Sequence, residues 1–160
     1  MPDVDPSQFR ELCGRFATGV AIVTAVERDG RPVGMTASSF TSVSLQPPLI
    51  SINVDRAAEL HRTLQDTTSF AINILESSQE ALSRRFAEVH PSRFEGVGYQ
   101  INQRGLPILD GTLATLECER VQLVDAGDHT IVIARVAGGE VREGRPLLHY
   151  RGGYHAPGLG

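Results

Sequence analysis

Runs of β-branched residues separated by short turns constrain the fold of this chain most. Residues 20–26 (Val-Ala-Ile-Val-Thr-Ala-Val) have the composition of a strand, and Arg28-Asp29-Gly30-Arg31 follows with the Asp-Gly signature of a hairpin. We therefore expect an antiparallel return through residues 33–37. The same signals predict strands over residues 49–54, 70–75, 112–124, 130–141 and 146–150, with a tight hairpin at 126–128.

Helix signals are fewer than strand signals. Asp5 can cap a first helix, and Pro6 suits its first turn. Apolar residues recur at helical spacing from Phe9 to Phe16, and Gly19 is a stop signal.

Two later segments also predict helices. Asp55 can cap a short helix that holds Leu60 and Leu64. Ser77-Ser78-Gln79-Glu80 has the pattern of a capping box, and the helix that it opens would bury Leu82 and Phe86.

The length and the order of these elements indicate the fold class. A chain of 160 residues suits one domain, here residues 1–160. Hairpin-spaced strands with few helices argue against a doubly wound parallel sheet. About six or more strands in so short a chain would leave exposed edges, and closing the sheet into a barrel removes them. We expect a mainly β (α+β) fold, an antiparallel barrel with about three peripheral helices.

The charge balance argues against some classes of partner. With 15 basic and 19 acidic residues the formal net charge is -4, whereas nucleic-acid binders normally carry a basic excess. No apolar run approaches the roughly 20 residues that span a bilayer, and the first residues lack a secretory pattern. We therefore expect no nucleic-acid partner, no membrane association and a cytoplasmic location.

Cysteine and histidine spacing gives no sign of a metal site. Cys13 and Cys118 are isolated and are expected to be buried apolar residues. The five histidines show no metal-binding spacing, so we predict no metal.

The segment from Gly34 to Ser42 (Gly-Met-Thr-Ala-Ser-Ser-Phe-Thr-Ser) combines small side chains with hydroxyls. Small residues let a ligand approach the backbone amides, and hydroxyls suit a polar ring edge or a phosphate. The same composition also describes a polar strand end that feeds a loop. From the residues alone both interpretations stand.

Other side chains have similar pairs of interpretations. Arg84 or Arg85 could clamp a phosphate, or could lie on a solvated helix end. His129 could be an acid or a hydrogen-bond donor beside a ligand, or a turn histidine on a backbone carbonyl. Tyr150 and Tyr154 could stack on a flat ring, or could be strand-end aromatics.

Common nucleotide-binding and nucleophile motifs are absent from the sequence. There is no Gly-x-Gly-x-x-Gly, no Walker loop and no Gly-x-Ser-x-Gly. Any nucleotide or flavin site must therefore be built in another way.

Five segments in a fixed order resemble the short-chain flavin reductase family, the reductase components of two-component flavin-dependent monooxygenases. They are residues 16–24, 34–45 with Pro47-Pro48, 70–75, 127–133 and 146–154, and the resemblance runs from about Phe9 to Tyr154. It implies a split β-barrel of the FMN-binding type and a homodimer. It also implies FMN or FAD as flavin, NADH or NADPH as co-substrate, and a separate oxygenase component that receives reduced flavin.

The resemblance implies roles for individual residues. The main flavin-binding stretch would be Gly34, Met35, Thr36, Ala37, Ser38, Ser39 and Phe40, with Ser51, Ile52 and Asn53 on the next strand. Arg85 and Phe86 match the helix end on the phosphate side of the flavin. A nicotinamide-side contact would be formed by Arg15, Thr18 and Gly19, and Tyr150 and Tyr154 would close that pocket. His129 matches the histidine of the family's Gly-Asp-His segment and is the predicted catalytic residue.

The implied reaction is hydride transfer from NADH or NADPH to the flavin. The chain has Ala57-Ala58 where relatives often carry a serine that can hold the flavin phosphate or sugar, which leaves FMN and FAD open. The alternatives are a non-catalytic split-barrel protein that holds flavin or haem as a carrier or sensor, and an oxidase of pyridoxamine-phosphate type. The Gly-Asp-His segment favours the reductase over both.

Overall fold

The fold is mostly antiparallel sheet with three helices. A computed structural model describes residues 1–90 and 92–158. The helices are α1 (Pro6–Cys13), α2 (Glu59–Asp66) and α3 (Glu80–Ala87). The strands are β1 (Thr18–Gly19), β2 (Ala21–Val26), β3 (Pro32–Ala37), β4 (Thr41–Ser44), β5 (Leu49–Asp55), β6 (Ser69–Ile74), β7 (Tyr99–Ile101), β8 (Pro107–Leu109), β9 (Ala114–Ala126), β10 (His129–Val141), β11 (Leu148–Tyr150) and β12 (Gly153–His155).

The predicted strands and hairpins are confirmed. β2 pairs antiparallel with β3 around a turn in which Gly30 has φ 88°, a left-handed conformation that glycine adopts without strain. β9 and β10 form the long hairpin, with Gly127 at φ 63° in its turn. The sequence signals missed five short strands, β1, β4, β7, β8 and β12.

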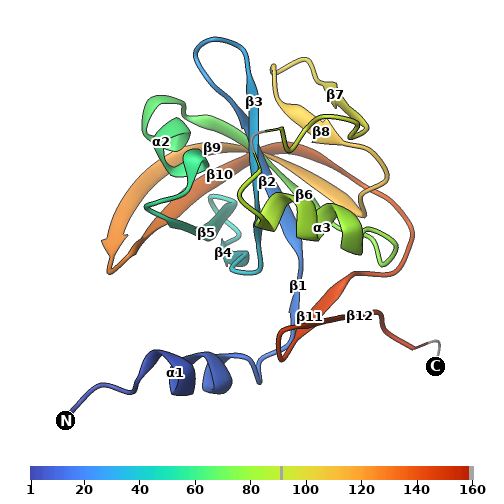
Figure 1. The fold of residues 1–160 in the computed structure, drawn as a ribbon. Helices are drawn as coiled ribbons and strands as arrows, with labels where there is room; N and C mark the ends of the chain where they lie inside the picture. Colours follow the sequence, from blue (N-terminus) through green and yellow to red (C-terminus); the bar gives the residue numbers. More distant parts are fainter. Residues whose placement is uncertain (91, 159–160) are drawn as a thin grey trace.

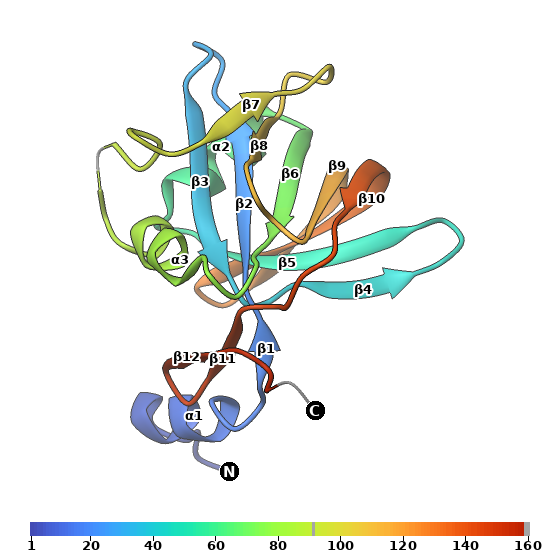
Figure 2. The same cartoon turned by 90° about the vertical axis from the view of Figure 1, so that its right-hand side faces the viewer.

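The main sheet is strongly curved but its ladder does not close (Figures 1 and 2). Its seven strands follow the order β3-β2-β6-β9-β10-β5-β4, so β3 and β4 end the ladder among the described residues. The expected mainly β, antiparallel fold with three helices is confirmed, and the hydrogen-bonded ladder itself stays open between β3 and β4 in the described part of the chain. β3 and β5 nevertheless contact each other, so the curved sheet encloses a core.

Two apolar clusters fill the fold. The first lies inside the curved sheet, with buried side chains from β2, β3, β5, β6, β9 and β10 and from Leu60 and Leu64 of α2. The second lies outside β2, where Phe86 of α3 packs with Val20, Ile22 and neighbouring residues. α3 therefore covers the outer side of β2 and β3, which fixes its position beside the segment from Gly34 to Ser42.

Of the three predicted helix caps, only the first is confirmed. The Asp5 side chain accepts hydrogen bonds from the amides of Ser7 and Gln8, as predicted, but α1 ends at Cys13 because residues 18–19 pair with β11. Asp55 does not cap α2: its carboxylate accepts from the Ala57 amide, and the N-cap position is Ala58.

The predicted capping box at the start of α3 is also wrong. Gln79 is the N-cap residue, and no side chain caps the helix. The hydroxyls of Ser77 and Ser78 donate to Glu76 instead. Glu80 accepts from Arg84, one turn further along the helix. The Glu76 carboxylate, one residue before the pattern, therefore accepts hydrogen bonds from the two serine hydroxyls, which a capping box would need at the start of the helix.

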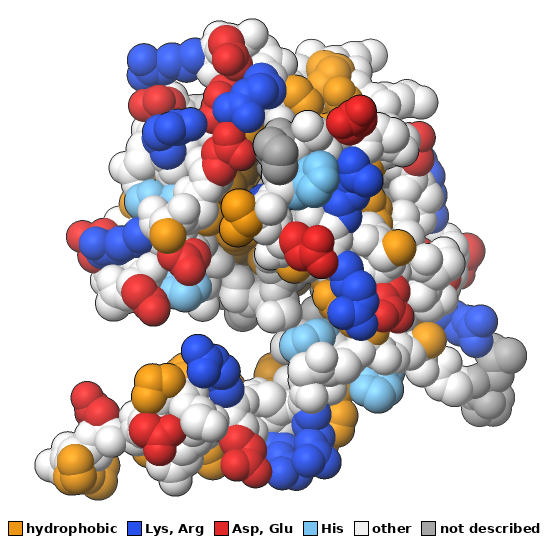
Figure 3. All heavy atoms as spheres, in the orientation of Figure 1, with side chains coloured by type: hydrophobic (Ala, Val, Ile, Leu, Met, Phe, Trp, Pro, Cys, Tyr) orange, Lys and Arg blue, Asp and Glu red, His pale blue; other side chains and the backbone are white. Residues whose placement is uncertain are grey.

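A small three-stranded sheet, order β1-β11-β12, stands away from the main sheet together with α1. We call these segments, residues 6–19 and 148–155, the arm. No residue of α1 is buried, and the side chains of Phe9, Leu12 and Phe16 are 57%, 59% and 79% exposed. Figure 3 shows apolar side chains on this part of the arm. Cys13 is exposed, contrary to expectation, whereas Cys118 is buried as predicted.

No helix in the described ranges has the length and apolar character needed to cross a membrane.

Candidate functional site

The segment from Gly34 to Phe40 runs along β3 and leaves it at a point where it is tied to β5. The Asn53 amide of β5 donates to the Ser39 hydroxyl over 2.9 Å. Thr36 is tied in the other direction, because its hydroxyl donates to the Ser83 carbonyl of α3 over 2.7 Å. Ser38 lies between these anchors and is exposed. The predicted segment is thus held on both sides and presents Ser38 to solvent.

Register places two of the three predicted β5 residues, Ser51 and Asn53, on one face of the sheet with residues of β10. Ser51 lies opposite Ile133, and Asn53 lies opposite Ile131, in antiparallel pairs whose side chains share a face. The two isoleucines are partly buried, and Asn53 is exposed. We call this surface the outer β5–β10 face. It comprises Ser51, Asn53, Ile131 and Ile133, together with Ser38, the residue before the Ser39 that is hydrogen-bonded to Asn53. It has an apolar centre and a neutral polar edge.

Four of the predicted residues are buried. Ile52 and Phe86 are 0% exposed, and Ala37 and Gly34 are buried. A Cβ on Gly34 would lie 2.7 Å from Cε1 of Phe86, so a glycine is needed where β3 passes under this ring. Met35 and Phe40 are partly buried against the first cluster. Ile52 and Ala37 could touch a ligand on the outer face only through their backbone.

The guanidinium of Arg85 lies among backbone carbonyls. Its Nε donates to the Arg93 carbonyl over 2.7 Å, and its Nη2 donates to the carbonyls of Ser92 and Glu95. Arg93 in turn donates to the Gly34 carbonyl over 2.6 Å. In this conformation Arg85 organises the loop after α3, which then supports β3.

His129 is the first residue of β10 and lies opposite Asp55, which is two residues beyond Asn53 on β5. The His129 side chain therefore lies on the same face of the sheet as that of Asn53. Its Nδ1 lies 2.6 Å from a carboxylate oxygen of Asp128. That hydrogen bond to His129 lowers the pKa of the Asp128 carboxyl. Because a carboxylate only accepts, Nδ1 carries the proton and Nε2 is left for another partner. His129 therefore lies at one end of the outer β5–β10 face.

The predicted nicotinamide-side residues all lie on the arm. Thr18 and Gly19 of β1 pair with His149 and Leu148 of β11, next to Tyr150. The Arg151 amide donates to the Gly14 carbonyl over 3.0 Å, which brings Arg15 to the same turn. Tyr154 follows on β12. The structure thus brings together Arg15, Thr18, Gly19, Tyr150 and Tyr154, as a group apart from His129.

A residue that sequence analysis missed joins the arm to β3. The Ser83 hydroxyl lies 2.8 Å from the Tyr154 hydroxyl, while the Ser83 carbonyl accepts from Thr36. Ser83 is 0% exposed. Nothing in the helical pattern of α3 marks this serine, because its two partners are 47 and 71 residues away.

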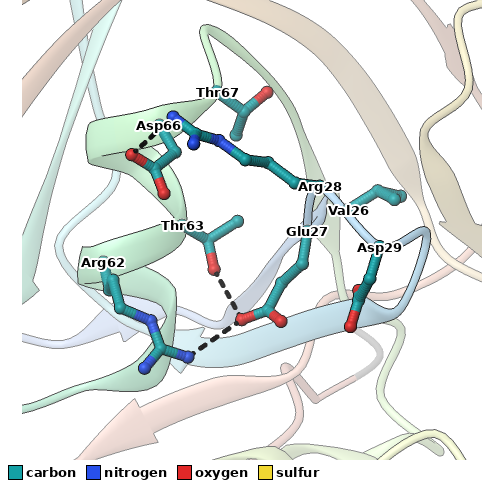
Figure 4. A pocket seen from close by; sticks show the side chains of 8 residues that line it. All are labelled: Val26, Glu27, Arg28, Asp29, Arg62, Thr63, Asp66 and Thr67. Atoms are coloured by element: carbon teal, nitrogen blue, oxygen red, sulfur yellow. Dashed lines mark hydrogen bonds and ion pairs between the residues drawn. The ribbon is translucent and has the colours of Figure 1, made fainter.

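A large hollow lies elsewhere, between the β2–β3 turn and α2 (Figure 4). It has a volume of about 510 Å³, and Glu27 is one of its lining residues. Glu27 pairs with Arg31 over 2.7 Å and with Arg62 over 3.2 Å, and the hydrogen bond from Arg31 lowers its pKa. Arg31 and Arg62 are both exposed, so the hollow is an open surface depression bordered by ion pairs, and none of the residues predicted for the flavin lines it.

The chemistry of the outer β5–β10 face fits a flavin. A flat heteroaromatic ring needs an apolar surface beneath it and neutral hydrogen-bonding groups at its edge. Ile131 and Ile133 offer the apolar surface, and Ser38, Ser51 and Asn53 offer the hydrogen-bonding groups.

Within the described ranges there is no group of three or more His, Cys, Asp or Glu side chains that could hold a metal ion. Burial raises the pKa of the Cys118 thiol to about 12, which makes it a poor nucleophile.

Comparison with known proteins gives one consistent result. The model of the family described as "Flavin reductase like domain" matches residues 13–158. A "Flavin reductase" of Pseudomonas putida is 40% identical over 152 residues, which are 94% of this chain and 89% of that protein. The protein named "Probable flavin reductase" in Rhizobium meliloti strain 1021 is 39% identical over 97% of this chain, which spans only 50% of that relative's length.

A solved structure gives the same result for the fold. The NADH:FAD oxidoreductase of Streptomyces globisporus, determined with NAD and FAD fragments, has a TM-score of 0.88 and 38% sequence identity. The match covers 97% of this chain and 96% of that one.

Proposed function

This chain belongs to the flavin reductase-like domain family, and from that premise we propose that it is an NAD(P)H:flavin oxidoreductase. It reduces FMN or FAD by hydride transfer and supplies the reduced flavin to a partner monooxygenase. The observation that supports the proposal is that His129 and Asn53 share one face of β5 and β10, and that the Asn53 amide is hydrogen-bonded to Ser39 of the predicted flavin-binding segment. Two relatives support it, since one is an "FMN reductase (NADH)" and another a "Flavin-dependent monooxygenase, reductase subunit".

The division of labour in this reaction follows from the site. When bound, flavin and nicotinamide supply the hydride chemistry themselves, so no strong acid–base pair is required of the protein. The outer β5–β10 face holds the flavin, with Ser38 and Asn53 donating hydrogen bonds at its edge. Two planar rings react only when they are held in register, and the arm supplies the second set of contacts.

We infer that His129, at one end of the outer β5–β10 face, acts beside the flavin ring where the nicotinamide approaches. The Asp128 carboxylate accepts a hydrogen bond from Nδ1, which leaves Nε2 free to contact a ligand. Nε2 accepts a hydrogen bond when the imidazole is neutral and donates one when the imidazole is protonated. This gives His129 an orienting and proton-handling role at a defined atom.

The apolar side chains of α1 support a homodimer. Phe9 and Leu12 are largely exposed on a helix with no buried residue, and Phe16, just beyond the end of this helix, is exposed as well. A second copy of the chain covers them in this proposal, because contiguous exposed apolar surface marks interaction sites. Sedimentation of the wild-type protein and of Phe9→Ser/Leu12→Ser tests this: a dimer that becomes a monomer supports it, and a monomeric wild type rejects it.

Mixing the protein with FMN and NADH tests the main proposal. Multiple-turnover loss of NADH absorbance supports a reductase, and parallel mixtures with NADPH and with FAD identify the preferred pair. Flavin that binds tightly, with no NADH consumption, would instead indicate a carrier or sensor. The same assay with an added monooxygenase component, monitored by product formation, tests delivery of reduced flavin.

A further inference from the structure

The contacts of Ser83 make it the junction between the β3 segment and the arm. Its main chain and its side chain bind in opposite directions: the carbonyl accepts from Thr36 over 2.7 Å, and the hydroxyl meets that of Tyr154 at 2.8 Å. Both contacts are at least partly buried, and Ser83 itself is fully buried. A displacement of Tyr154 is therefore opposed at the same residue that anchors β3.

Tyr154 is held on its ring faces as well as at its hydroxyl. The Arg84 guanidinium carbon lies 4.8 Å from the centre of the Tyr154 ring, a cation–π distance. Glu80 fixes that guanidinium through hydrogen bonds of 3.0 and 2.7 Å. The His149 ring packs edge-on at 5.5 Å. Among these contacts only the hydroxyl bond to Ser83 has the directionality that sets where the ring lies.

The arm has few other attachments to the main body. α1 buries no residue, and β1, β11 and β12 pair only with one another among the described strands. The segment that leads into β11 is attached through the amide of Leu147, which donates to the Leu75 carbonyl over 3.2 Å. Tyr154 also packs against the second cluster, so losing its bond to Ser83 loosens the position of the ring on the arm and leaves the strand ladders of the main sheet intact.

We propose that Ser83 is a positioning residue that fixes the arm relative to β3 through the Tyr154 hydroxyl, and so sets the affinity for the nicotinamide nucleotide. The inference rests on the proposed function, because the arm carries the nicotinamide-side residues only if the protein is a reductase. The Ser83 carbonyl, which anchors Thr36 of β3, is retained when the hydroxyl bond to Tyr154 is lost, so flavin affinity should change little.

The test compares Ser83→Ala, Tyr154→Phe and the double variant with the wild-type protein. Each substitution removes the same hydrogen bond, whose neutral character sets the expected effect at about three- to tenfold. We expect KM for NADH to rise by that factor in both single variants, with kcat and the FMN Kd changed less than about twofold. The double variant should match the single ones, because two changes that break one interaction are not additive.

Tyr99→Phe is the matched control. Tyr99 packs against Phe94 in the second cluster and lies outside the arm, so its loss of a hydroxyl should leave KM for NADH unchanged. Hydrogen exchange gives a readout that needs no activity: amides of residues 153–155 should exchange about fivefold faster in Ser83→Ala and Tyr154→Phe, with the β2 amides unaffected.

The outcomes separate the inference from the function on which it rests. If wild-type protein consumes no NADH, the reductase proposal fails, and exchange alone decides whether the bond holds the arm. If wild type is active but KM for NADH is unchanged in both single variants, or the two effects add, Ser83 has no positioning role. If Ser83→Ala does not fold, Tyr154→Phe decides the question by the same criteria.

Discussion

The Ser39 hydroxyl lies 2.9 Å from the backbone nitrogen of Asn53 and joins the end of β3 to β5, two strands that share no ladder. One side chain thus bridges the opening in the main sheet. Ser38, the adjacent residue, is exposed and bridges nothing comparable.

These neighbouring serines should therefore respond differently to the loss of a hydroxyl. We expect Ser39→Ala to lower the free energy of unfolding by about 1 kcal/mol, the typical value of one hydrogen bond. Ser38→Ala should change it by less than about 0.5 kcal/mol, as at other exposed sites. Urea unfolding followed by circular dichroism measures both, and equal destabilisation would contradict the bridging role.

A bulky residue at Ser38 should block the flavin site. Ser38→Phe places a ring at the edge of the outer β5–β10 face, and we expect the FMN Kd to rise at least about 100-fold. Titration monitored by flavin fluorescence measures this. Thr68→Phe, an exposed position between α2 and β6, is the control for a bulky surface residue. Retained FMN affinity in Ser38→Phe would remove this face from the site.

His129 should affect the reaction more than the binding. His129→Ala removes the ring whose Nδ1 is held by Asp128, and we expect the rate of flavin reduction to fall about tenfold or more. The FMN Kd should change less than about threefold. Stopped-flow reduction and flavin titration separate the two effects, and an unchanged reduction rate excludes His129 from the mechanism.

Gly34 should tolerate no side chain. A Cβ there would lie 2.7 Å from the Phe86 ring and 3.2 Å from the Val23 carbonyl, so Gly34→Ala overpacks the contact between β3 and α3. We expect a loss of about 1–3 kcal/mol in unfolding free energy. Gly19→Ala is the stability control, since a Cβ added at Gly19 would meet no atom within 4 Å. Equal stability of the two variants would be the contrary result.

Glu76 should contribute stability that depends on pH. Hydrogen bonds from Ser77 and Ser78 lower its pKa from 4.5 to about 2 in the folded protein. A lowered pKa means that the ionised group stabilises the fold above pH 4.5, and that this contribution is lost as the pH falls toward 2. Glu76→Gln should therefore lower Tm at neutral pH, with a difference that disappears by about pH 2. A difference independent of pH would exclude this origin.

Local signals in the sequence were sufficient for most of the sheet. Asp-Gly turns and β-branched runs predict β2, β3, β5, β6, β9 and β10, because strand and hairpin chemistry acts over a few residues. The capping-box prediction was wrong because a residue outside the four-residue motif decided the contacts. Glu76, one residue before the pattern, competes for Ser77 and Ser78, and a four-residue motif contains no information about that neighbour.

The candidate site was predictable as a set of residues but not as an arrangement. Resemblance named Thr36, Ser39, His129 and Tyr154, yet it gave no indication that Ser83 connects two of them. Arg85 shows the opposite limit: its charge suggested a phosphate ligand, whereas the loop after α3 folds back and surrounds it with carbonyls. Contacts over tens of residues depend on tertiary packing, which local patterns do not encode.

The most direct measurement is anaerobic mixing of NADH with the protein and FMN, monitored by flavin absorbance. With oxygen excluded, reduced flavin accumulates and its formation is observed in a single turnover. A reductase should bleach about one equivalent of FMN per equivalent of NADH, at a rate that saturates with NADH and far exceeds that of the two nucleotides alone. Bleaching no faster with the protein than without it, while FMN remains bound, would contradict the account and leave a flavin-binding protein without this activity.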